Sequence, residues 1–244
     1  MIAFDIELAS LVEIPPGGDL DALGPFELSV AAARDDRGGA WTWHGGEPAR
    51  PAPRMSSADA RAVLLHLRER IRAGETVVAW NGVGFDLKWL GAAADDVRLA
   101  SEVALGTCDP LLQLFHARGF PVSLAAVADG LGITQKKSMS GAEAPRAWAR
   151  GEHARVIEYV HGDCSLTLEV ARRIVERKAV RWITKRGTPA SEPMARLLTA
   201  RELLALPPPD QSWMTTPIRR ERFFDWLRTE SDSTPPFSIQ PPRA

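Results

Sequence analysis

The chain opens with the stretch Met1-Ile-Ala-Phe-Asp-Ile-Glu-Leu8, in which large apolar residues occupy every second position. This period of two predicts a β-strand with Asp5 and Glu7 on one face and the large apolar side chains on the other. Apolar flanks of this kind indicate a central strand, where two unpaired acids are costly. A hard divalent cation is the natural partner for such a pair. Asp5 and Glu7 therefore predict a cation site, and a solvated strand face is the alternative that this stretch leaves open.

A third acid follows a glycine-rich turn in the stretch Trp80-Asn-Gly-Val-Gly-Phe-Asp86. We expect a short apolar strand over 76–80 and a helix that begins at Phe85, which places Asp86 in the first helical turn. An acid at this position also satisfies the free amides of a helix start, so a plain cap is the alternative. The turn lacks the Gly-Lys-Ser/Thr ending of a phosphate-binding loop and the spacing of a dinucleotide fingerprint.

A fourth acid and the only tyrosine of the chain occur together in the stretch Tyr159-Val-His-Gly-Asp163. Apolar positions spaced for one buried face predict a long helix over 152–178, so Tyr159 and Asp163 lie one turn apart on the same face. The chain uses Phe and Trp eight times each, which favours a role for the Tyr159 hydroxyl. A buried tyrosine with a backbone partner is the alternative. Gly162 is a poor helix former, so we expect another backbone or a substrate to pass close to it.

These three stretches, in this order, resemble the three motifs of the DEDD exonuclease superfamily. They resemble in particular the proofreading-exonuclease domain of family-B DNA polymerases and its stand-alone bacterial relatives. The family's Phe-Asp-Ile-Glu stands here as Phe4 to Glu7, its Asn-x-x-x-Phe-Asp as Asn81 to Asp86, and its Tyr-x-x-x-Asp as Tyr159 to Asp163. The sister branch has His five residues before the last acid, where this chain has Glu158. The resemblance is therefore to the tyrosine (DEDDy) type, and it covers residues 1–178.

The resemblance implies hydrolysis at these acids with two divalent cations, Mg²⁺ or Mn²⁺, as cofactors. Asp5 would bind both ions, and Glu7 and Asp163 would complete the ligand shell of the first. Asp86 would hold the second ion. Tyr159 would orient the attacking water, and the ordinary tyrosine pKa of about 10 argues against its acting as the base.

The resemblance also implies the partner, the 3′ end of a single-stranded nucleic acid with DNA favoured, and nucleoside 5′-monophosphates as products. Asn81 and Phe85 would position the terminal nucleotide, Phe85 partly by stacking. Lys136 and Lys137 would contact phosphates. Leu8 stands where the family often has a threonine that contacts the substrate, a departure that bears on affinity more than on chemistry.

The fold implied is ribonuclease H-like: an α/β domain with a mixed five-stranded sheet flanked by helices. We expect this domain over 1–178 and a C-terminal extension over 179–230 with a hairpin and short helices near 194–206 and 219–227. A proline-rich tail would occupy 231–244.

Composition and charge argue against a membrane protein, a disulfide-rich protein and a protein that attracts acidic polymers by its overall charge. The net charge is −1, so an acidic polymer must be held by local patches or bound metal. Two cysteines suggest no disulfide framework, and the absence of a long apolar stretch predicts no membrane span; we expect a cytoplasmic protein. Two alternatives remain open: a nucleic-acid-binding module on the same fold with weak or lost catalysis, and a phosphoesterase for small nucleotides. A long basic groove would separate the exonuclease from the latter.

Overall fold

The computed structural model describes residues 1–13, 15, 18–135 and 138–228. Within these residues the main sheet has four strands in the order β3-β2-β1-β6. Strand β1 lies inside the sheet and pairs antiparallel with β2 and parallel with β6, so the sheet is mixed. The strands are β1 (Ile2–Leu8), β2 (Leu28–Asp35), β3 (Ala40–His44) and β6 (Val77–Val78).

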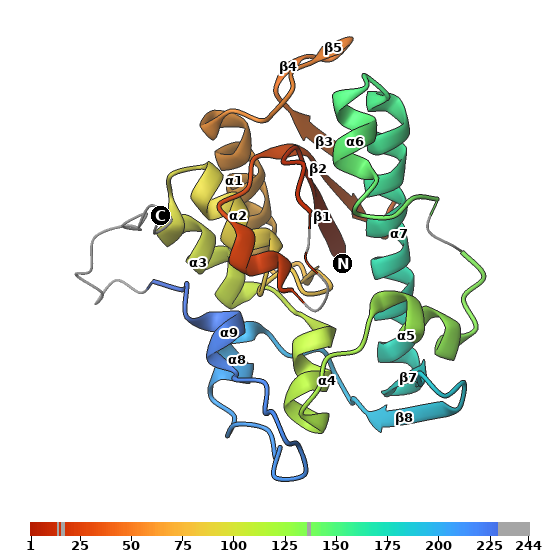
Figure 1. Ribbon diagram of the computed structural model, residues 1–244. Coiled ribbons are helices and arrows are strands. Elements are labelled where there is room, and N and C mark those ends of the chain that lie inside the picture. The colour runs from red at the N-terminus through yellow and green to blue at the C-terminus, as the bar shows by residue number, and fades with distance from the viewer. Residues whose placement is uncertain (14, 16–17, 136–137, 229–244) are drawn as a thin grey trace.

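Helices cover both faces of this sheet (Figure 1). One face carries α1 (Ser57–Arg72), α2 (Asp86–Ala93) and α3 (Val97–Gly106), and the other carries α6 (Ala144–Ala149) and α7 (His153–Arg177). Alternation along β1 sorts its residues between the two layers: Ile2, Phe4 and Ile6 join the core under α1–α3, whereas Ala3 joins the core under α7. The period of two is confirmed, and it turns Asp5 and Glu7 towards α7.

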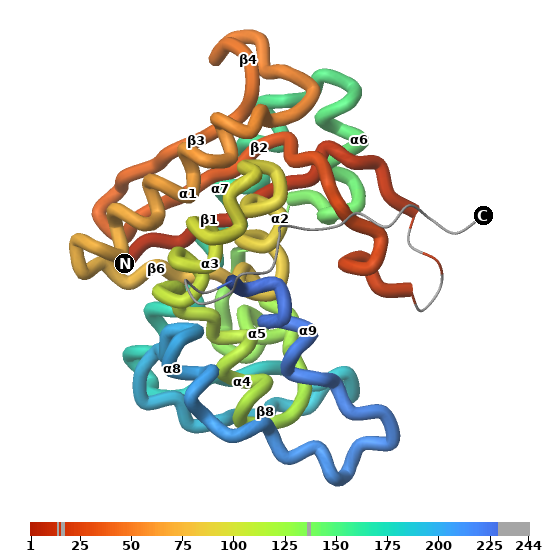
Figure 2. Tube along the Cα trace, turned by 90° about the vertical axis from the view of Figure 1, so that its left-hand side faces the viewer, coloured from red at the N-terminus to blue at the C-terminus, as the bar shows by residue number. Residues whose placement is uncertain are grey.

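A second group of elements lies beside one end of the sheet (Figures 1 and 2). Its core includes Leu114, Val127 and Trp182 together with Ile174 of α7, so the C-terminal half of α7 joins the two parts. Its elements are α4 (Pro110–Arg118), α5 (Leu124–Leu131), β7 (Ala179–Ile183) and β8 (Pro189–Pro193). The C-terminal helices α8 (Ala200–Leu204) and α9 (Glu221–Phe224) pack their buried residues into the core under α1–α3. Three small elements complete the description: η1 (Leu20–Leu23), β4 (Gly46–Glu47) and β5 (Arg50–Pro51).

The α/β class with a mixed sheet is confirmed, but among the described residues the main sheet has four strands instead of the expected five, and Cys108 beside β6 forms only isolated bridges with Val78 and Thr199. The Cys108 amide donates to the Val77 carbonyl at 2.8 Å, and the Ala79 amide donates to the Cys108 carbonyl at 3.1 Å. Pro110 begins α4 two residues later. Because the chain enters a helix at once, the strand has no room to extend.

The helix expected over 194–206 is shorter than predicted. Thr199 and Glu202 form a capping box, which fixes the start of α8 at Ala200. The Met194 amide instead donates to the Lys178 carbonyl at 2.9 Å and closes the β7–β8 hairpin. The tail at 231–244 lies outside the described residues. No helix in the described part of the chain has the length and apolar character needed to cross a bilayer.

Candidate active site

Three acids from two elements converge on one point. Asp5 and Glu7 project from β1 and Asp163 from α7, and each offers a carboxylate oxygen that lies within 4.8 Å of the other two. Glu7 and Asp163 are buried and Asp5 is half-buried. Three carboxylates this close repel one another, and a cation relieves that repulsion. The all-oxygen donor set fits a hard divalent ion such as Mg²⁺ or Mn²⁺.

Asp86 approaches the same strand from a different element. It lies in the first turn of α2, is buried, and accepts a hydrogen bond from the Ile6 amide at 3.3 Å. Ile6 separates Asp5 from Glu7 in the chain, so Asp86 reaches the strand between the two acids. It does not belong to the three-acid cluster itself. Three of the four acids thus form one cluster, and the fourth, Asp86, lies apart from them at the Ile6 amide.

Tyr159 lies beside the cluster on α7, one turn before Asp163. The ring is buried. Burial raises the pKa of Tyr159 well above its usual range, and the charges of Glu7, Asp163 and Asp5 and a hydrogen bond with Asp163 raise the pKa further. The phenol is therefore protonated at neutral pH and can donate a hydrogen bond, but it cannot take up a proton there.

Gly162 does not have the close backbone neighbour that we expected. A Cβ at this position would meet, at 4.0 Å, only Nε2 of Gln135 among the described residues. That amide donates to the Gly162 carbonyl at 2.8 Å. A packed backbone among the described residues is thus not the reason for this glycine, and passage of a substrate stays a prediction.

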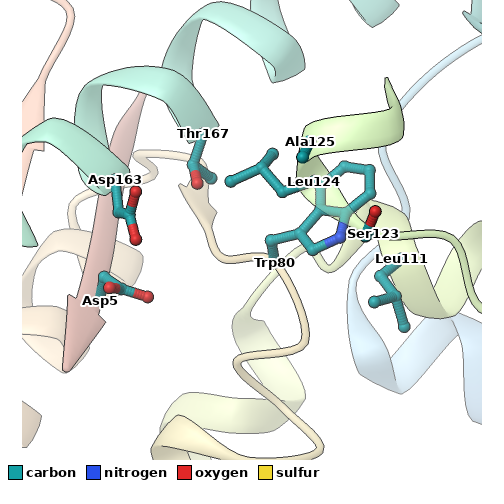
Figure 3. Close-up of a pocket in the computed structure, with 8 residues that line it drawn as sticks. All are labelled: Asp5, Trp80, Leu111, Ser123, Leu124, Ala125, Asp163 and Thr167. Carbon is teal, nitrogen blue, oxygen red and sulfur yellow. The ribbon is translucent and has the colours of Figure 1, made fainter. Parts of the chain in front are cut away.

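Two of the three acids, Asp5 and Asp163, line a cavity of about 260 Å³ (Figure 3). Asp5, Asp163 and Thr167 line one side of it, and Trp80 and Ser123 line the other. The Trp80 indole donates from Nε1 to the Val122 carbonyl at 3.1 Å, which fixes the plane of the ring. Thr167, Trp80 and Ser123 were not predicted as site residues from the sequence. A signal existed for two of them, because Trp80 precedes the second motif directly and Thr167 follows Asp163 by one helical turn.

The turn after Trp80 is shaped by a buried acid that the sequence analysis also missed. Asp109 is fully buried and accepts the amides of Asn81 and Val83, each at 3.1 Å. Asn81 adopts a left-handed backbone with φ of 66°, which asparagine tolerates better than most residues. Burial raises the Asp109 pKa from 3.8 to about 6, although its backbone hydrogen bonds lower it. The position of Asp109 before Pro110 predicts only that it caps α4, and the structure shows that it does so.

The expected substrate-binding residues do not all reach the cavity of the acids. Asn81 and Phe85 line a second cavity of about 230 Å³. Leu8 lines a third cavity, of about 80 Å³, next to Pro145. Lys136 and Lys137 lie outside the described residues. The structure therefore brings Asp5 and Asp163 into one cavity and places Asn81, Phe85 and Leu8 at other cavities.

Comparison with known proteins identifies the fold family. No curated protein matches the chain. Among solved structures, the chain is similar to the family B DNA polymerase from the hyperthermophilic archaeon Pyrobaculum calidifontis, with 17% identity and a TM-score of 0.48 over 71% of this chain. The chain spans only 24% of the length of that polymerase. A profile of the RNase_H superfamily matches residues 40–175, a span that includes Asp86, Tyr159 and Asp163 and begins after Asp5 and Glu7. With this match over more than half of its length and a mixed sheet flanked by helices, the chain belongs to the RNase H superfamily.

Proposed function

We propose that this protein is a 3′–5′ exonuclease that hydrolyses the phosphodiester bonds of single-stranded nucleic acid, with DNA favoured, and releases nucleoside 5′-monophosphates. Membership of the RNase H superfamily supports a nuclease-type function. The observation that carries the finer proposal is the convergence of Asp5, Glu7 and Asp163, whose carboxylate oxygens lie within 4.8 Å of one another. We assign the reaction to residues 1–178 and regard 179–230 as an extension of that domain.

The acids and Tyr159 have separate tasks in this proposal. Asp5, Glu7 and Asp163 would hold one divalent ion, and Asp86 would contribute to holding a second from its separate position on α2. Bound divalent ions supply Lewis acidity and neutralise charge that develops on the phosphodiester oxygens. Tyr159, kept protonated by its buried and acidic surroundings, would release its hydrogen bond with Asp163 when that carboxylate holds the ion, and would donate the same proton to the attacking water. The carboxylates beside it are the groups that can accept the proton from that water.

The shape of the cavity favours the end of a strand over the middle of a duplex. Its volume of about 260 Å³ falls below the usual range of about 300–1,000 Å³ for pockets that enclose a drug-sized ligand. Trp80 presents an aromatic side chain at its wall, and aromatic faces bind unpaired bases without regard to sequence. A paired end must first be unstacked, which costs a few kcal/mol. A terminal, unpaired nucleotide is therefore the substrate group that we place here.

The direct test is incubation of the purified chain with end-labelled single-stranded DNA and RNA. We expect cleavage with Mg²⁺ or Mn²⁺, no cleavage with a chelator, and faster cleavage of the DNA. Equal binding of the strands with no cleavage under any metal would favour the binding module over the nuclease. Cleavage that persists in excess chelator would exclude the metal-dependent site.

A further inference from the structure

The C-terminal extension packs against the turn that contains Asn81 and Phe85. The indole Nε1 of Trp226 is buried and donates to the Val83 carbonyl at 2.9 Å. Phe223 packs so closely on the turn that a Cβ added at Gly84 would lie 2.8 Å from its ring. Only glycine fits there without displacement of the extension. The segment around α9 is thus a fixed neighbour of the second motif.

This contact places Arg222 beside the second motif, where it lines two cavities. Arg222 lines the cavity of about 230 Å³ that also contains Asn81 and Phe85. It lines a further cavity of about 330 Å³ together with Asn81, Leu111 and Ser123. Leu111 and Ser123 also line the cavity that contains Asp5 and Asp163. These shared walls make a line of three adjoining hollows that leads from the acids to Arg222.

Among the residues that the structure describes, the guanidinium of Arg222 pairs with one carboxylate, which a ligand could replace. It pairs with Asp19 at 2.6 Å, and the two side chains are 49% and 41% exposed. Exposed pairs of this kind contribute little to stability. A phosphate that binds the guanidinium through two oxygens is a stronger partner than a solvated carboxylate. The other acid of this cavity, Asp21, is already paired with Lys88 at 2.6 Å, so Asp19 is the carboxylate that competes for Arg222.

We propose that Arg222 binds a backbone phosphate of the substrate strand, upstream of the nucleotide at the acids, and that Asp19 occupies this cation in the free protein. The inference rests on the proposed function, because it takes the strand to enter the line of hollows with its 3′ end at the acids. It gives the C-terminal extension a substrate-binding role. It also predicts that the protein binds a strand of several nucleotides more tightly than a dinucleotide.

The test measures binding without turnover. A fluorescein-labelled single-stranded oligothymidylate is titrated with the full chain in chelator, and the dissociation constant is read from anisotropy over a range of salt concentrations. We expect Arg222→Gln to weaken binding about tenfold and to reduce the salt slope by about 0.7, the value for one lost contact to a single strand. Arg222→Lys should keep most of that slope. Asp19→Asn should tighten binding, because the competing charge is removed.

Arg219→Gln is the matched control. It removes the same charge three residues away, from a side chain that is 83% exposed and pairs with Glu221, and it should change binding by less than about twofold. The proposal is wrong if Arg222→Gln changes the dissociation constant no more than this control does. It is also wrong if Arg222→Gln and Asp19→Asn weaken binding to the same extent, because that result would mean that the ion pair has only a structural role. Cleavage in metal is assayed separately. If the wild type cleaves the strand but Arg222→Gln does not weaken binding, only this inference is wrong. If Arg222→Gln weakens binding but the wild type does not cleave in any metal, only the proposed reaction is wrong.

Discussion

Asp5 contributes one of three crowded carboxylates, and its replacement by asparagine separates the effect of charge from that of volume. We expect Asp5→Asn to lower the cleavage rate below about a tenth of the wild-type rate, because bound ions supply several kcal/mol of transition-state stabilisation. Stability without metal should be unchanged or higher, since the repulsion among Asp5, Glu7 and Asp163 falls. Initial rates in Mn²⁺ and thermal unfolding in chelator measure the two effects. Asp95→Asn, the same substitution at an exposed turn, is the control and should change neither.

Tyr159 tests the role of a single hydroxyl. Tyr159→Phe keeps the buried ring and removes the donor, so we expect folding and metal binding to persist. The cleavage rate should fall by roughly 10- to 1000-fold, the usual contribution of a positioned proton-handling group. Metal titration by calorimetry and single-turnover kinetics separate binding from chemistry. An unchanged single-turnover rate would show that the hydroxyl serves only packing.

At this scale the sequence predicts the acids better than the residues around them. The cluster of Asp5, Glu7 and Asp163 follows from two local patterns, a strand period and a helical spacing of four, and the structure joins them. The walls of the cavities do not follow from such patterns. Ser123 and Arg222 reach the site only through the packing of distant segments, and no local spacing encodes that packing.

At the scale of elements, the Asp109 carboxylate joins two segments, because it accepts hydrogen bonds from the second-motif turn and from the start of α4. Burial raises the Asp109 pKa from 3.8 to about 6, so folding favours its protonated form. The stability that this group contributes is fully present below about pH 4 and is lost as the pH rises through about 6. We expect the free energy of unfolding of the wild type, relative to Asp109→Asn, to fall by up to about 3 kcal/mol over that interval. Urea unfolding of both proteins from pH 4 to 7 measures the difference, and parallel curves would contradict the buried-acid account.

The lengths and positions of elements were predicted where one segment determines them. The helix expected over 152–178 is α7, His153–Arg177, and the hairpin start expected after Lys178 is β7. The two failures arise where a local start signal fixes the beginning of a helix. Cys108 forms only a bridge because Pro110 starts a helix, and α8 is short because Thr199 and Glu202 cap it internally. Propensity alone does not reveal which of several competing partners a backbone group will take.

Across the whole molecule, the two sides of the sheet have different roles. One face is closed by α1–α3, whereas α7 brings Tyr159 and Asp163 to Asp5 and Glu7 on the other (Figure 1). The segments after α7 return past α4 to the second motif, so the C-terminal extension contacts the site rather than leaving it (Figure 2). With a net charge of −1, the protein gains no general attraction for nucleic acid. Under the proposed function, binding would therefore depend on local cations such as Arg222 and on metal at the acids.

The most direct test of the central claim is the polarity of cleavage. A 5′-labelled linear single strand and a circular single strand of the same sequence are incubated with the protein in Mn²⁺, with Asp5→Asn beside the wild type. The proposed 3′–5′ exonuclease activity should give a ladder that shortens stepwise from the 3′ end, an intact circle, slower attack on blunt duplex, and rates that fall with added salt. Rapid cutting of the circle by the wild type but not by Asp5→Asn would contradict it, because the acids would then serve an endonuclease.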